Sequence, residues 1–339
     1  MEVDRAISRL RGQNRAVSPA SEGVSLKTHR SGSRHRKMYT CRRHDLKLAF
    51  GNERFLSPSQ HMTRPSSDVL DIAARFASSA AFPEAVRAYA VGLAKFREAP
   101  LLVNKLVATD VRWRIVGYLL YLDADHEVFG PEGGATYSRL FDICSRRREA
   151  GPTTLKTVLA LLRLTGFVRA VRDSRDGRAT LYRPTKKMDG FVREWLGYGV
   201  AALEQLEPDR GWARMFAEDG DFVRRFLVSG GRDHVGGRPI AELMPTPLAD
   251  FTAQAGAFSV IWALWLARDF DQPAPSRAAI GRRYGLSKTQ VTNVITAGGK
   301  YGLFALNVDG GAVPTEMLHA ALQRWIAIEL AYYAIHMQT

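Results

Sequence analysis

The sequence predicts a mainly α-helical protein with small β-wings, in which two winged helix-turn-helix units follow one another. Three observations support this fold class. Apolar residues recur at helical spacing through most of the chain after residue 66. Short β-forming segments flank an Asp176-Gly177 turn, and a similar pair flanks Asp309-Gly310-Gly311. The order helix, helix, helix, strand, turn, strand is therefore expected twice.

Positive charge is concentrated in two segments of the 339-residue chain, whose formal net charge is +14. Residues 1–67 carry 14 Lys or Arg against 5 Asp or Glu, and residues 139–187 carry 13 against 4. Residues 188–258 are acidic, with 7 against 11. Two separate basic segments indicate a polyanionic partner, and double-stranded DNA is the partner that we expect.

Several classes of protein are not expected from this sequence. The densest apolar run, residues 258–267, is too short for a membrane span. The two cysteines provide no disulfide framework. No spacing typical of a metal site, a nucleophile elbow, a kinase or a dinucleotide-binding enzyme is present. We therefore expect a cytoplasmic, nucleoid-associated protein with no membrane partner, no catalytic residue, no cofactor and no metal.

The chain is predicted to have five parts. These are a basic disordered tail (1–65), N-terminal helices (66–103), a first winged helix-turn-helix (104–188), a helical linker or dimerisation region (189–257) and a second winged helix-turn-helix with a C-terminal helix (258–339). The tail has too few apolar residues to order itself. In the fourth part, which we expect to connect the units or to form a homodimer, the glycine-rich stretch 230–239 is predicted to be a loop.

The clearest helix-turn-helix pattern is IGRRYGLSKTQVTNVI, residues 280–295. Gly285 is expected to take the left-handed conformation of a tight turn, and Ser287 to cap the next helix. The apolar residues of that helix then face inward. The polar side chains left facing outward are Lys288, Thr289, Gln290, Thr292 and Asn293. Such side chains read base edges or hold phosphates, although a polar face towards solvent is the simpler alternative.

The corresponding helix of the first unit is predicted over residues 153–165, with Leu155, Val158, Leu159 and Leu162 as its buried stripe. We expect its other face to meet base edges in the major groove. The residues concerned are Thr153, Thr154, Lys156 and Thr157. The preceding helix ends in Arg146, Arg147 and Arg148, where positive charge suits both the helix dipole and a DNA phosphate.

The segment VRDSRDGRATLY, residues 171–182, reads as a tight hairpin with an unusual number of arginines. The chemistry of the Asp176-Gly177 turn does not explain Arg172, Arg175 and Arg178. Ion pairs within the hairpin do not explain them either, because surface ion pairs contribute little stability. We therefore expect these arginines to contact DNA. Residues 136–187 resemble the winged helix-turn-helix of MarR-type transcriptional regulators, with a D-x-R-x-x-R wing pattern starting at Asp173. The resemblance implies that Arg175 enters the minor groove and that Asp173 braces the wing arginines.

The second unit departs from this pattern. Its wing, NVDGGAVP, has no arginine, and Gly298-Gly299 is expected to interrupt the exit from its second helix. The expected function is a sequence-specific, double-stranded DNA-binding transcriptional regulator with recognition helices in the major groove. Two alternatives stay open: a plasmid-type replication initiator, which also carries tandem winged helices, and a winged-helix protein-interaction module with a non-specific basic tail. The sequence identifies no small-molecule effector.

Overall fold

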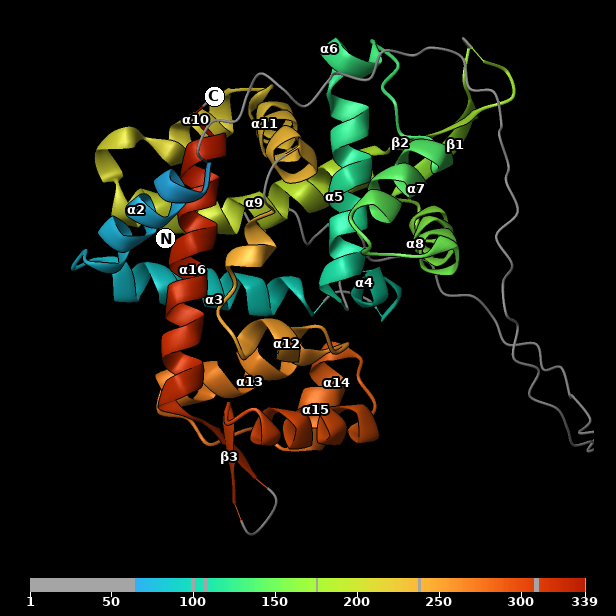
Figure 1. The fold of residues 1–339 in the computed structure, drawn as a ribbon. Helices are drawn as coiled ribbons and strands as arrows, with labels where there is room; N and C mark the ends of the chain where they lie inside the picture. Colours follow the sequence, from blue (N-terminus) through green and yellow to red (C-terminus); the bar gives the residue numbers. More distant parts are fainter. Residues whose placement is uncertain are drawn as a thin grey trace, which may run out of the picture. The chain divides into compact units, whose positions relative to one another are not determined.

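The computed structural model describes residues 65–98, 101–106, 109–174, 176–236, 239–307 and 311–338 (Figure 1). The predicted basic tail, except for Pro65, lies outside the described residues, and so does Arg175. The described part is mainly helical and contains two small antiparallel sheets of two strands each, as the sequence predicts.

Two long segments of the chain repeat one order of elements. The chain begins with α2 (Pro65–Ala77), α3 (Phe82–Phe96) and α4 (Leu101–Leu106). The first unit, residues 110–206, comprises α5 (Asp110–Ala124), α6 (His126–Phe129), α7 (Tyr137–Arg146), α8 (Pro152–Leu164), β1 (Val168–Arg172), β2 (Thr180–Pro184) and α9 (Lys186–Leu206). The segment between the units contains η1 (Pro208–Arg210), α10 (Trp212–Glu218), α11 (Phe222–Gly236), η2 (Ile240–Leu243) and α12 (Leu248–Thr252). The second unit, residues 257–336, comprises α13 (Ala257–Asp269), α14 (Arg277–Tyr284), α15 (Lys288–Lys300), β3 (Phe304–Leu306), β4 (Ala312–Pro314) and α16 (Glu316–His336).

The two units also share the hydrogen bonds that join the hairpin to the helix on each side of it. Gly166 and Gly302, which follow α8 and α15, both have a φ of +72°. The hydroxyl of Thr185 donates to the carbonyl of Gly166, and that of Thr315 donates to the carbonyl of Gly302, at 2.8 Å in each case. The likeness of the two units therefore extends from the order of elements to individual bonds.

The expected interruption at Gly298-Gly299 is wrong, because α15 continues through both glycines to Lys300. A Cβ atom on Gly298 would lie 2.3 Å from the ring of Phe304, and one on Gly299 would lie 3.1 Å from Leu306. The glycines therefore let β3 approach the helix closely, and the exit turn is formed further on.

The predicted loop at residues 230–239 is also wrong in its first part, because α11 runs to Gly236. A Cβ atom on Gly230 would lie 2.6 Å from the hydroxyl of Tyr332, and one on Gly231 would lie 2.4 Å from the ring of Tyr121. These glycines allow α11 to pack against α16 and α5. Glycine content here reflects close helix packing rather than a turn.

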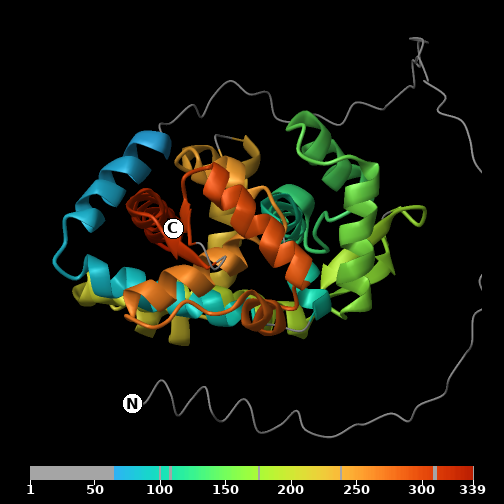
Figure 2. The ribbon, with the colours of Figure 1, turned by 90° about the horizontal axis from the view of Figure 1, so that it is seen from below.

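One hydrophobic core extends from Val69 to Met337. α16 packs along α2, and Figure 2 shows α16 almost end-on beside that helix. α3 packs along α9, which crosses between α16 and α5 in Figure 1. The domain boundaries stay predictions, and the one placed at 188/189 falls inside α9. Among the described residues, no helix combines the length and apolar content needed to cross a membrane.

Candidate nucleic-acid interface

In the first unit, the helix α8, which follows the turn after α7, has one buried and one exposed face. Its predicted apolar stripe is confirmed, since Leu155, Val158, Leu159 and Leu162 are each at most 4% exposed. Thr153, Lys156 and Thr157 are exposed, whereas Thr154 is half-buried. The hydroxyl of Thr157 donates to the carbonyl of Thr153 at 2.8 Å, so it can offer a ligand only an acceptor. Lys156, and Arg163 in the last turn of the helix, are the exposed cationic residues of α8.

The three arginines at the end of α7 have different environments. Arg146 forms an exposed pair with Asp142, 2.8 Å from Nη2 to Oδ2, and such a pair is easily exchanged for a phosphate. The side chain of Arg147 is only 16% exposed, and its Nε donates to Glu149 at 3.0 Å. Its Nη1 also donates to the carbonyl of His234 at 3.0 Å. Protein acceptors therefore occupy its guanidinium, and the expectation that Arg147 holds the DNA backbone stays a prediction.

The third arginine, Arg148, has an unusual backbone. Its φ is +54°, a left-handed conformation that costs residues other than glycine about 1–2 kcal/mol. The N–H of Glu149 closes the end of α7 by donating to the carbonyl of Cys144 at 3.0 Å. The side chain is exposed and has no carboxylate partner among the described residues. Arg148 is thus placed to offer its charge to a ligand.

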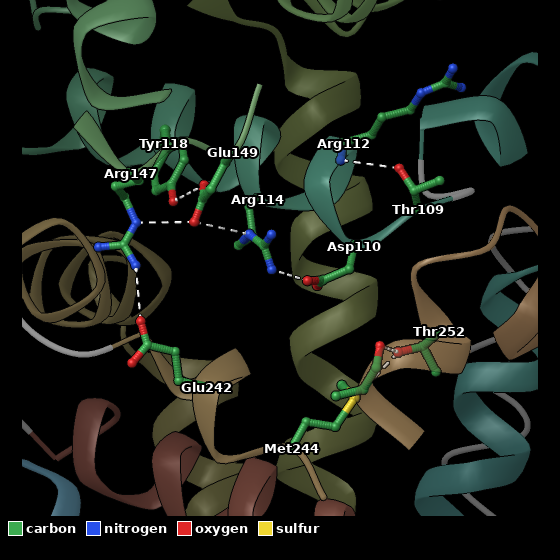
Figure 3. Close-up of polar contacts among 11 residues, drawn as sticks. Thr109, Asp110, Arg112, Arg114, Tyr118, Arg147, Glu149, Glu242, Met244 and Thr252 are labelled. Carbon is green, nitrogen blue, oxygen red and sulfur yellow. Dashed lines mark hydrogen bonds and ion pairs between the residues drawn. The ribbon is translucent and has the colours of Figure 1, made fainter. Parts of the chain in front are cut away.

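A polar network connects the turn between α7 and α8 to α5 (Figure 3). Glu149 accepts a hydrogen bond from the hydroxyl of Tyr118 at 2.6 Å and lies 3.4 Å from Nε of Arg114. Arg114 in turn pairs with Asp110, four residues earlier on the same helix. Burial and the hydrogen bond to Glu149 raise the pKa of Tyr118 well above its ordinary value. The turn is therefore fixed by groups inside the protein.

The hairpin of the first unit has a braced tip. Arg172 pairs with Thr180 across the strands, and its Nη1 donates to the carbonyl of Gly177 at 2.7 Å. The backbone N–H of Arg178 donates to Oδ1 of Asp176 at 3.0 Å, while its side chain is exposed. Arg172 therefore stabilises the turn, and Arg178 is the described wing arginine that extends outward.

Asp173 is 7% exposed at the end of β1, and its backbone N–H donates to the carbonyl of Ala179 at 3.1 Å. A buried carboxyl at this position suits a bracing role, but its effect on the wing arginines stays a prediction. The predicted minor-groove residue, Arg175, lies outside the described residues.

Sequence reasoning missed the support that the loop after α6 gives to this hairpin. The hydroxyl of Ser174 lies 2.7 Å from both carboxylate oxygens of Glu132. Thr136 forms a β-bridge with Leu181, and the N–H of Tyr182 donates to the carbonyl of Ala135 at 2.8 Å. A β-bridge formed by one residue has no characteristic sequence pattern, and so these contacts could not be predicted from the sequence.

The polar face of α15 is smaller than predicted. The turn before it is confirmed, since Gly285 is left-handed and Ser287 accepts a hydrogen bond from the N–H of Gln290 at 3.1 Å. The amide of Gln290 donates to the carbonyl of Ala255 at 3.0 Å. The hydroxyl of Thr292 accepts a hydrogen bond from Arg277 at 3.3 Å. These two side chains are therefore half-buried and bonded within the protein, whereas Lys288, Thr289 and Asn293 are exposed, and DNA contact by the five residues stays a prediction.

The hairpin of the second unit differs in chemistry from the first. Leu306 and Val313 are large apolar side chains that are exposed on its strands, and Tyr301 at the end of α15 and Met317 at the start of α16 are exposed beside it. No lysine or arginine lies in β3 or β4. The two hairpins thus share a fold but offer different surfaces.

Exposed cationic groups of the first unit lie on three consecutive parts: Arg148 in the turn, Lys156 and Arg163 on α8, and Arg169, Arg172 and Arg178 in the hairpin. The second unit exposes fewer such groups on the corresponding parts. Comparison with protein-family models found no match for this chain, and comparisons with curated proteins and with solved structures found none either.

Proposed function

We propose that the protein is a sequence-specific, double-stranded DNA-binding transcriptional regulator that acts in the cytoplasm. In this proposal both units are winged helix-turn-helix units, so that one chain carries two of them in tandem. The common hydrogen bonds at Gly166 and Gly302 and the common order of elements support the assignment of both units to one motif. In this proposal the first unit makes the main contact with DNA.

The observation that carries the proposal is that some arginines of the first unit are paired with carboxylates whereas others are not. Arg147 and Arg183 pair with carboxylates, 3.0 Å from Glu149 and 3.2 Å from Asp123. Arg148 and Arg178, by contrast, are exposed and have no carboxylate partner among the described residues. A surface of this kind with adjacent hydroxyl groups is typical of proteins that bind the phosphate backbone.

Each group has a distinct role in the proposed complex. Arg146 and Arg148 hold backbone phosphates beside the start of α8. Thr153 and Lys156 then reach base edges from the first turns of that helix, where helix-turn-helix proteins make their base contacts. Arg178, together with Arg175 as the resemblance implies, contacts the neighbouring minor groove, whose width and potential depend on sequence.

The second unit favours a second candidate function for part of the chain. Its exposed apolar residues in and beside the hairpin suit contact with a protein more than contact with DNA. In that case Lys288, Thr289 and Asn293 add only weak, non-specific affinity. Binding of a protein by the second unit does not require the first unit to release DNA.

Selection from a randomised duplex pool tests the proposed function. The full chain and residues 61–339, which include every described residue, are used in parallel. We expect both to enrich the same sequence. A replication initiator would instead enrich directly repeated sites and open the duplex. Binding that disappears together with residues 1–60 would exclude the proposal and favour the interaction module.

A further inference from the structure

The exposed face of α8 presents methyl groups as well as charges. Thr157, Ala160 and Leu164 are all exposed, and they follow one another at spacings of three and four residues. Residues at these spacings lie on the same side of an α-helix. The three side chains therefore place their methyl groups in a row along the exposed side of α8, and we call this row the methyl line.

Leu164, at the end of the methyl line, is 71% exposed, more than any other large apolar side chain of the described residues. A single exposed leucine is common on protein surfaces. Leu164, however, continues the row that Thr157 and Ala160 begin, and Lys156 and Arg163 are exposed on the same helix. Apolar groups exposed next to cations suit a partner that offers both apolar and anionic groups, as the major groove of DNA does.

The hydroxyl of Thr157 is bonded within the helix. It donates to the carbonyl of Thr153, four residues earlier, at 2.8 Å. A threonine hydroxyl that bonds the helix backbone in this way cannot donate to a base at the same time. Its methyl group is then the part of the side chain that gains most from being covered by a partner, because burial of apolar surface is favourable. Thr157 thus belongs with Ala160 and Leu164 by its chemistry as well as by its position.

Cationic side chains lie at both ends of α8. Arg148 is exposed in the turn before the helix, and Arg169 and Arg178 are exposed in the hairpin that follows it. If DNA contacts both of these ends, the whole exposed face of α8 lies along the major groove. An α-helix rises about 1.5 Å per residue and base pairs are about 3.4 Å apart, so the methyl line from Thr157 to Leu164 spans about three base pairs.

We propose that Thr157, Ala160 and Leu164 select the target sequence by contact with the C5-methyl groups of pyrimidines on adjacent base pairs. In the major groove this methyl group distinguishes thymine from the other unmodified bases, and 5-methylcytosine carries it at the same position. Thymine is therefore the base that the methyl line selects in unmodified DNA. The inference rests on the proposed DNA-binding function, and it adds Ala160 and Leu164 to the residues that determine specificity.

Uracil tests the methyl contact, because it lacks the methyl group of thymine and presents the same hydrogen-bonding edge. Each thymine of the duplex that the full chain selects is replaced by uracil in turn, and fluorescence anisotropy measures the affinity. We expect about fourfold weaker binding at two or three adjacent base pairs, which corresponds to the burial of one apolar carbon at each. Affinity within about twofold of the unmodified duplex at every position would overturn the inference, as would a selected sequence without thymine.

A second set of duplexes distinguishes the two sources of the methyl group. At a sensitive position the T·A pair is replaced by C·G and by 5-methylcytosine·G. We expect 5-methylcytosine to bind more tightly than cytosine and less tightly than thymine. Tighter binding of 5-methylcytosine than of thymine would support the methyl contact and identify methylated cytosine as its source. Equal binding of cytosine and 5-methylcytosine would overturn the contact.

Two exposed leucines provide a matched pair of variants. In Leu164→Ala, one of the sensitive positions should no longer distinguish thymine from uracil, because the side chain that covers its methyl group is gone. Leu306→Ala is the control, since Leu306 is 51% exposed in the hairpin of the second unit, and it should keep the wild-type ratio of affinities at every position. An unchanged set of ratios in Leu164→Ala would overturn the role assigned to Leu164.

Thr157 allows the methyl group and the hydroxyl to be removed separately. Thr157→Val keeps a methyl group at this position and should still distinguish thymine from uracil, whereas Thr157→Ser keeps only the hydroxyl and should lose this distinction at one position. The opposite result would show that the hydroxyl reads the base, and it would overturn the role assigned to Thr157. A chain that binds its selected duplex specifically but treats thymine and uracil alike overturns the inference and leaves the proposed function intact. A chain that enriches no sequence refutes both.

Discussion

Arg148 and Gly285 hold the same backbone position in the two units. Their φ values are +54° and +66°, and each precedes a residue whose N–H closes the preceding helix, at 3.0 Å and 2.9 Å. Glycine takes this conformation without strain, whereas arginine does not. The first unit thus tolerates strain to keep a charged side chain in its turn, which agrees with a role for that charge in binding.

We predict that Arg148→Gly stabilises the protein and weakens DNA binding at the same time. Removal of the strain should raise the free energy of unfolding by about 1 kcal/mol, as measured by chemical denaturation. Loss of the charge should weaken binding several-fold in fluorescence anisotropy. Arg148→Lys keeps both the strain and the charge, and it should match the wild type in both measurements. Equal DNA affinity of the Gly and Lys variants would remove Arg148 from the interface.

The intramolecular bonds of Arg147 predict a contrast with its neighbour Arg146. Arg147→Ala leaves the half-buried Glu149 without a charged partner on one side, and it should lower the free energy of unfolding by about 2–4 kcal/mol. Arg146→Ala breaks only an exposed pair and should change it by about 0.5 kcal/mol or less. Urea denaturation of both variants checks this. A small effect of Arg147→Ala on stability, with a large loss of DNA affinity, would show that Arg147 acts in the DNA contact instead.

The wing prediction concerns Arg178 and Arg175. Replacement of either by alanine should weaken binding to the selected duplex by about 1–3 kcal/mol. Arg210→Ala, an exposed arginine in η1 outside both units, is the control and should leave binding unchanged. Arg172→Ala should act mainly through the shape of the turn, because Arg172 bonds the carbonyl of Gly177. Wild-type affinity in both wing variants at physiological salt would exclude the hairpin from the contact.

Glu329 predicts a pH dependence of stability. The folded chain keeps the proton of this carboxyl group up to a pKa of about 8, whereas the ordinary value is 4.5. Its contribution to stability is therefore fully present below about pH 4.5 and is lost as the pH rises to about 8. Glu329→Gln, which cannot ionise, should gain stability relative to the wild type across this window, on the order of a few kcal/mol. Thermal unfolding from pH 5 to pH 8.5 checks this, and a constant difference between the two proteins would contradict it.

The sequence allowed both repeated orders of elements to be predicted, because periodicity and turn chemistry are local. The inward stripe of α8 and the capped turn at Gly285 and Ser287 are confirmed for this reason. The glycines of α11 and α15 were misinterpreted, because their function depends on Tyr332, Tyr121 and Phe304, aromatic residues that only the tertiary fold brings close.

The candidate site was predictable only in part for the same reason. A helical face can be read from spacing, and Lys156 and Lys288 are exposed as expected. Whether a polar side chain already has a hydrogen-bond partner within the protein depends on groups that are distant in the sequence. Arg147 is held by the carbonyl of His234, which is 87 residues away, and Gln290 by that of Ala255. The cavity among α5, α9, α11, η2 and α16 had no signal in the sequence, since its wall comes from five separate elements.

The most direct test of sequence-specific binding is the affinity ratio of residues 61–339 for the selected duplex over a scrambled duplex of the same composition. Fluorescence anisotropy at physiological salt measures both affinities. We predict a ratio of about a thousand or more, as is usual for specific DNA-binding proteins. A ratio close to one would show that residues 61–339 bind DNA only through the charge of its phosphates, without regard to sequence. That result would contradict the proposed function.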